Sequence, residues 1–244
     1  MTDTHFLLTP EWPAPPTVRA YTTLCGRNAD FDLLKTANRQ QLKTLLSLPK
    51  EPAWLKQTHS KTVVRAYTDC DADASYTDSP GEVCVIMTAD CLPVLLYDLK
   101  AQKIAAIHAG WRGLAAGILQ ETLRAGGFSG PDTLAWLGPA IGPQQFEVGP
   151  EVRDLFLAHW PHCTDAFYAS SQGRFLANIY TIATHQLALL GVSRISGGHH
   201  CTFSEKNLFF SYRRNKETGR MASLIWMEPA FTGNIEGFMN KSGD

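Results

Sequence analysis

Two apolar segments each place one reactive side chain at a segment end. "MTADCLPVLLYD" (87–98) carries Cys91 before its apolar run, and "KIAAIHAGWRG" (103–113) carries His108 after its own. A third candidate, His59, lies upstream in "QTHS". Two imidazoles and one thiolate would hold a divalent cation and leave one coordination position open, as in a catalytic zinc site. The ligands are far apart in sequence, so this interpretation requires the fold to bring them together.

The same atoms also fit a cysteine nucleophile. Cys91 would attack the substrate and His108 would be its base, as in cysteine hydrolases and protein deamidases. That chemistry needs a thiolate with a lowered pKa within hydrogen-bond reach of the imidazole. The sequence leaves both mechanisms open, and metal content distinguishes them.

The segment after His108 adds a candidate anion site. Gly110 and Gly113 would let the backbone approach a ligand, and Arg112 has a guanidinium suited to phosphate or carboxylate. A tight turn with Arg112 in solvent is the alternative. Arg213 and Arg214, in "SYRR", form a second candidate anion contact.

Composition excludes several classes of protein. The chain has 244 residues, 44% of them apolar, and 22 basic residues balance 23 acidic ones. That balance predicts neither a nucleic-acid nor a membrane-surface partner. The N-terminus lacks a secretory leader pattern and no apolar run reaches 18 residues, so we expect a cytoplasmic protein. Six cysteines without a C-x-x-C pair indicate reduced thiols.

The patterning predicts one α/β domain, with a mixed sheet flanked by helices, over residues 1–228, and a flexible tail over 229–244. Period-2 and continuously apolar segments indicate strands, and two of them, 93–98 and 103–110, form an expected hairpin. Residues 69–81, rich in Asp, Ser and Gly, are expected to form a loop. The remaining expected strands are 18–23, one or two within 53–68, 82–90, 133–137, 193–197 and 221–227; the expected helices are 37–48, 111–125, 150–160 and 178–190.

Six motifs together closely resemble the YfiH/YlmD family, also labelled the laccase-domain or polyphenol oxidase family, which includes human FAMIN. They are "WLKQTHSKTVV", "ADASYTDSPG", "MTADCLPVLL", "AAIHAGWRGL", "LGPAIGPQQFEVGPEV" and "FFSYRRNKETGRMAS". The resemblance runs from about Ala53 to Met227. It implies a fold related to the catalytic domain of cytotoxic necrotizing factor. It also implies a zinc ion held by His59, Cys91 and His108, three residues that would act in catalysis.

The resemblance further implies a purine nucleoside phosphorylase that converts adenosine or inosine plus phosphate to base plus ribose 1-phosphate. Adenosine deamination and methylthioadenosine cleavage would occur in the same site. Arg112 and the neighbouring glycines would contact phosphate or ribose. The partners are then small molecules, and the protein a monomer or small homo-oligomer. Alternatives are a polyphenol oxidase, a cell-wall precursor quality-control enzyme and a non-catalytic zinc protein. Copper is disfavoured because the chain has eight histidines and no H-x-H pair.

One segment departs from the family pattern. Members usually carry T-x-R-x-G-G-x-S followed by N-x-G near the N-terminus, and this segment shapes the nucleoside pocket. Here the region is the shorter "YTTLCGRNADFDLL", with Leu24 about where the arginine is expected. Arg27 is the candidate replacement.

Overall fold

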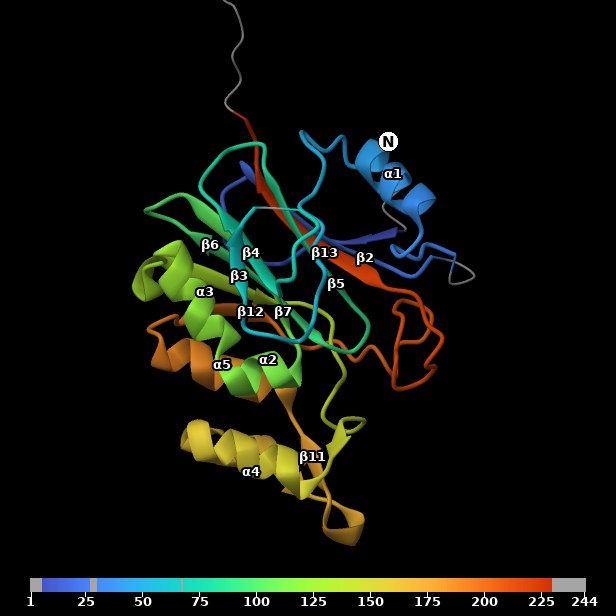
Figure 1. Ribbon diagram of the computed structural model, residues 1–244, viewed down its shortest axis with the longest axis vertical. Helices are drawn as coiled ribbons and strands as arrows, with labels where there is room; N and C mark the ends of the chain where they lie inside the picture. Colours follow the sequence, from blue (N-terminus) through green and yellow to red (C-terminus); the bar gives the residue numbers. More distant parts are fainter. Residues whose placement is uncertain (1–5, 27–29, 67, 230–244) are drawn as a thin grey trace, which may run out of the picture.

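Two β-sheets packed face to face form the centre of the protein, and helices cover both outer faces (Figure 1). The computed structural model describes residues 6–26, 30–66 and 68–229. Arg27 and the predicted tail beyond Pro229 lie outside these residues. None of the described helices is both long and apolar enough to cross a membrane.

The larger sheet has six strands in the order β12-β8-β6-β7-β4-β3. β6 and β7 form the expected antiparallel hairpin, whereas β3 pairs with β4 and β12 with β8 in parallel. The predicted mixed sheet is therefore confirmed. Its strands are β3 (Val63–Arg65), β4 (Ala74–Thr77), β6 (Leu92–Asp98), β7 (Lys103–Ala109), β8 (Thr133–Leu137) and β12 (Arg194–Gly197).

The second sheet is antiparallel, in the order β1-β2-β13-β5. Its inner face packs on the six-stranded sheet through Ile86, Ile225 and their neighbours, which contact Leu95 and Ile104. Every residue of β6 and β13 is buried, which explains their continuously apolar sequences. The strands are β1 (Leu7–Leu8), β2 (Val18–Thr23), β5 (Val83–Thr88) and β13 (Met221–Met227).

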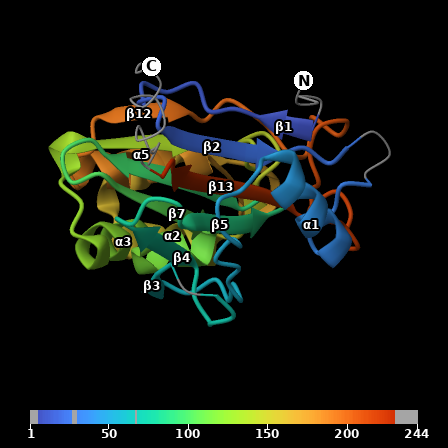
Figure 2. The ribbon, with the colours of Figure 1, turned by 90° about the horizontal axis from the view of Figure 1, so that it is seen from above.

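Helices α2, α3 and α5 cover the far face of the six-stranded sheet, and α1 covers the outside of the four-stranded sheet (Figures 1 and 2). α4 packs on a small third sheet, β10-β11-β9. The helices are α1 (Thr36–Leu45), α2 (Trp111–Ala116), α3 (Ile118–Gly126), α4 (Pro150–His159) and α5 (Ile179–Leu189), with 3-10 turns at Gly130–Asp132, Pro161–Ala166 and Ser171–Gly173; the small strands are β9 (Glu147–Val148), β10 (Phe167–Ala169) and β11 (Phe175–Ala177).

The structure corrects two of these expectations. The expected loop 69–81 contains β4, which lies between β3 and β7. The polar residues of this segment suggested a solvent-exposed loop. Asp73 and Ser75 are instead buried, at and beside the start of β4. The expected single helix 111–125 is two helices, since Gly117 has a left-handed φ of 88° that ends α2 before α3 begins.

Candidate metal centre and active site

Strand register brings two of the three candidate ligands together. In the β6–β7 hairpin, Leu92 pairs with Ala109 and Pro93 with His108. Cys91 immediately precedes β6, so its sulfur lies at the same sheet edge as the imidazole of His108. His59 reaches this edge from the segment that precedes β3. Neighbouring strand ends thus place side chains that are remote in sequence at one point.

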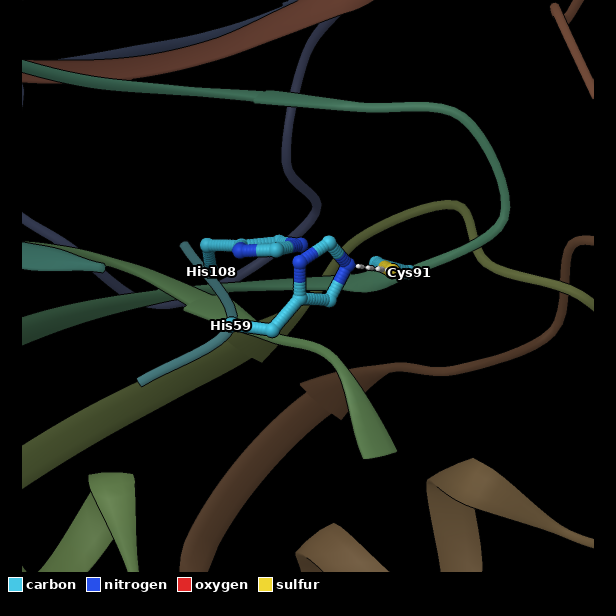
Figure 3. A group of neighbouring side chains, drawn as sticks. All are labelled: His59, Cys91 and His108. Atoms are coloured by element: carbon cyan, nitrogen blue, oxygen red, sulfur yellow. Dashed lines mark hydrogen bonds between the residues drawn. The ribbon is translucent and has the colours of Figure 1, made fainter. Parts of the chain in front are cut away.

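The three donor atoms form one compact group (Figure 3). They all lie within 4.8 Å of one another, and Cys91 Sγ is 3.8 Å from His59 Nε2. Zinc bonds of about 2.0 Å to nitrogen and 2.3 Å to sulfur place tetrahedral ligand atoms about 3.5 Å apart. A single ion therefore fits this group with only small movements of the side chains.

Asp73 holds both histidines in place. This buried carboxylate lies 2.7 Å from His108 Nδ1, which leaves Nε2 facing the thiol and His59. It also accepts hydrogen bonds from the backbone N–H groups of Thr58, His59 and Ser60, and from the Ser60 hydroxyl. His59 has a left-handed φ of 61°, a strained conformation that these bonds stabilise. A carboxylate that orients a metal-binding histidine is a common feature of metal sites.

Gly110 keeps the space between the three ligands open. A Cβ at this position would lie 3.1 Å from His59 Cδ2, 3.2 Å from Cys91 Sγ and 3.4 Å from His108 Nε2. Its φ of −62° suits any residue, so backbone conformation does not require glycine here. The missing side chain leaves room at the centre of the donor group, and the chemistry of the donors suits a divalent ion there.

The electrostatics favour a thiolate at Cys91. Burial acts to raise the pKa of this thiol, but hydrogen bonds with His108 and His59 lower it to about 6. Burial acts to lower the pKa of His108, whereas Asp73 and Cys91 raise it to about 9. By contrast, burial raises the pKa of the Cys84 thiol to about 12. A thiolate is the form required of a metal ligand and of a nucleophile.

Two cavities meet at the donor group. The larger, about 620 Å³, is lined by His59, Cys91 and His108 together with Leu34, Leu55, Lys56, Gln57, Met87, Thr88, Ala89, Arg112, Tyr212 and Arg220. The smaller, about 230 Å³, also reaches His59 and Cys91, and its other walls are Ala89, Asp90, Trp111, Arg112, Ile141, Phe146, Ile179, Tyr212, Arg213 and Lys216. A ligand in either cavity would lie beside the candidate metal centre.

The predicted anion-contacting residues separate into two groups. Arg112 lines both cavities and stacks on Trp111, with its guanidinium carbon 4.2 Å from the ring centroid. It forms no hydrogen bond or ion pair with the other described residues. Arg213 lines the smaller cavity.

The other three candidates, Gly110, Gly113 and Arg214, line neither cavity. Arg214 donates to the backbone carbonyls of Thr202, Phe203 and Phe209, and lines neither cavity. Gly113 lies in α2, where a Cβ would be 3.0 Å from the Ser60 carbonyl oxygen. The close approach of that helix to the His59 segment therefore requires glycine.

Sequence reasoning missed two aspartates that organise the site. Asp73 lies in the segment expected to be a loop. Asp90, inside the quoted "TADC", has a left-handed φ of 84° and accepts hydrogen bonds from the Thr202 and Ser211 hydroxyls and the Arg213 backbone N–H. Asp90 therefore holds the "SYRR" segment (211–214) close to Cys91. The sequence offered one signal, which is the position of Asp90 directly before Cys91 in "TADC".

Comparisons with known proteins identify the family. A family model described as multi-copper polyphenol oxidoreductase laccase matches residues 26–228. "Purine nucleoside phosphorylase YfiH" of Escherichia coli is 45% identical over 243 residues, which cover 91% of this chain and 98% of the relative. "Purine nucleoside phosphorylase PA4543" of Pseudomonas aeruginosa is 47% identical with the same coverage.

Solved structures agree with these matches. The Neisseria meningitidis protein NMB0706 superposes with a TM-score of 0.85 at 42% identity, covering 91% of this chain and 99% of that one. YlmD from Geobacillus stearothermophilus has a TM-score of 0.83 at 24% identity and supports the fold alone. The resemblance inferred from the six motifs is confirmed. The chain belongs to the YfiH family, which the matching model describes as multi-copper polyphenol oxidoreductase laccase.

Proposed function

We propose that the protein is a zinc-dependent purine nucleoside phosphorylase. It would convert adenosine or inosine and phosphate to the free base and ribose 1-phosphate, with adenosine deamination and methylthioadenosine cleavage as further activities. The observation that carries the proposal is a His-Cys-His donor group where two cavities meet, beside the Arg112 guanidinium, which forms no ion pair with the other residues that the structure describes. The names of the relatives, purine nucleoside phosphorylases at 45–47% identity, support the same reaction.

The donor set favours zinc as the bound metal. His59, Cys91 and His108 would hold it, and a zinc ion with an open position supplies a Lewis acid and lowers the pKa of bound water. Asp73 keeps Nδ1 of His108 engaged, so that Nε2 is the nitrogen available to the ion. Arg112 would neutralise an anionic substrate at the boundary of the two cavities. Copper is disfavoured since the described residues contain one group of three or more metal-ligating side chains, whereas multicopper oxidases need several.

The test is product analysis with metal-defined protein. Protein of known metal content is incubated with adenosine or inosine, with and without phosphate, and the products are separated by chromatography. We expect hypoxanthine from inosine and ribose 1-phosphate only when phosphate is present. His59→Ala should abolish turnover, while His162→Ala, an exposed histidine outside both cavities, should not. Failure to form ribose 1-phosphate with fully zinc-loaded protein would refute the proposal.

A cysteine hydrolase is the second candidate function, and the lowered pKa of Cys91 favours it. The same experiment separates the two. Full turnover of the nucleosides by protein stripped of metal would establish the nucleophile mechanism. Turnover that returns only with added zinc supports the phosphorylase. Oxygen consumption that depends on added copper would instead indicate a polyphenol oxidase.

A further inference from the structure

The larger cavity is lined by Lys56, Arg112 and Arg220 and by no acidic side chain among the described residues, and the smaller cavity carries positive charge as well. Arg112, Arg213 and Lys216 all line the smaller cavity. Among the described lining residues the acidic side chain is Asp90, and both its carboxylate oxygens already accept hydrogen bonds, Oδ1 from Thr202 and Oδ2 from Ser211 and Arg213. The cavity therefore presents cationic donors to a ligand without a free acidic acceptor.

Lys216 contacts an aromatic ring, and Arg213 contacts carbonyl groups. The Lys216 ammonium lies 4.2 Å from the centroid of the Tyr212 ring. The Arg213 guanidinium donates to the carbonyl oxygens of Gln145 and Glu147. Neither group forms an ion pair with a carboxylate among the described residues. Both charged groups are thus fixed in position without an ion pair and stay available to an anion.

Cavity size distinguishes the two compartments. A volume of about 620 Å³ falls within the range typical of small-molecule sites, about 300–1,000 Å³, whereas about 230 Å³ falls below it. The larger cavity suits a nucleoside and the smaller one a compact anion. Both are lined by Arg112, His59 and Cys91, so ligands in the two cavities would adjoin.

We propose that the smaller cavity is the phosphate subsite, with Lys216 and Arg213 as phosphate-binding residues, and that the nucleoside occupies the larger cavity. This inference rests on the proposed function. A phosphate oxygen would form the bond to C1′ of the ribose while the C1′–N bond breaks. The electron pair of that bond leaves on the purine nitrogen, which gains the proton of hydrogen phosphate. Arg112, at the boundary, would contact the phosphate next to the ribose.

The test measures the binding of each ligand alone, so that it does not depend on turnover. Equilibrium dialysis of zinc-loaded protein with labelled inorganic phosphate, and separately with labelled inosine, gives two Kd values per variant. Lys216→Met keeps the aliphatic stem and removes the charge. We expect its phosphate Kd to rise roughly 5- to 10-fold, since one charged contact is lost, and its inosine Kd to stay within about twofold.

Two variants complete the design. Lys56→Met removes a cation from the larger cavity and should leave the phosphate Kd unchanged. Lys206→Met, the same change outside both cavities, should alter neither value. An unchanged phosphate Kd in Lys216→Met overturns the assignment, as does a rise confined to inosine. Phosphate binding that weakens as expected without any ribose 1-phosphate formation would uphold the subsite and refute the phosphorylase.

Discussion

Replacing Gly110 by alanine should disable the metal centre while leaving the fold intact. The added methyl group would lie 3.1–3.4 Å from atoms of all three candidate ligands. Carbon makes its favourable contacts at about 3.5–4.0 Å. The sulfur and both imidazoles would therefore have to move by a few tenths of an ångström, and the methyl group would fill the space between them.

That displacement is large for a metal site. Metal–ligand distances tolerate a deviation of only about 0.2 Å, and loss of an orienting partner alone typically costs about 10- to 100-fold in affinity. We expect the zinc affinity of Gly110→Ala to fall at least 100-fold, because the substitution disturbs all three donors. Since φ is −62°, alanine suits the backbone, so the metal-free variant should unfold within about 1 kcal/mol of the metal-free parent.

Competition with a chromophoric chelator measures the zinc affinity, and denaturant unfolding of metal-free protein measures the stability. Gly113→Ala is the comparison variant, because its Cβ would meet the Ser60 carbonyl oxygen at 3.0 Å. Backbone yields less easily than a side chain, so this variant should lower the free energy of unfolding where Gly110→Ala does not. Zinc binding by Gly110→Ala as tight as that of the parent would contradict the assignment of this space to a metal.

Three further predictions concern the groups around the centre. Asp73→Asn should weaken zinc binding about 10- to 100-fold by chelator competition, because an amide has a single acceptor oxygen and cannot accept both from His108 and from Ser60; unchanged affinity would exclude a positioning role. Asp90→Asn should reduce the free energy of unfolding by about 1–3 kcal/mol in denaturant titrations, since a buried donor loses its acceptor; parental stability would argue against this. In metal-free protein, iodoacetamide should modify Cys91 faster than Cys84, as measured by mass spectrometry. The rate at Cys91 should fall as the pH drops through its pKa of about 6, because the thiolate becomes protonated. Zinc should protect Cys91, and a pH-independent rate would contradict the lowered pKa.

Local pattern determined much of the fold. Period-2 and continuously apolar segments identified β2, the β6–β7 hairpin, β8, β12 and β13, because buried strands need apolar side chains on one or both faces. Residue type singled out His59, Cys91 and His108 as candidate ligands of one divalent ion, and the motif resemblance strengthened the expectation that this ion is zinc. The fold class follows from the same information, since hairpins and crossover helices occur in one chain.

Only the tertiary structure decided what stands around those ligands. β4 escaped sequence reasoning because Asp73 and Ser75 are polar, and the burial of Asp73 is compensated by hydrogen bonds to partners at residues 58–60 and 108. The role of Gly110 depends on a space bounded by the side chains of His59, Cys91 and His108. Composition records which groups are available, but distances between remote segments follow from strand register and packing, and it is these distances that bring two imidazoles, one thiolate and one aspartate to a single point.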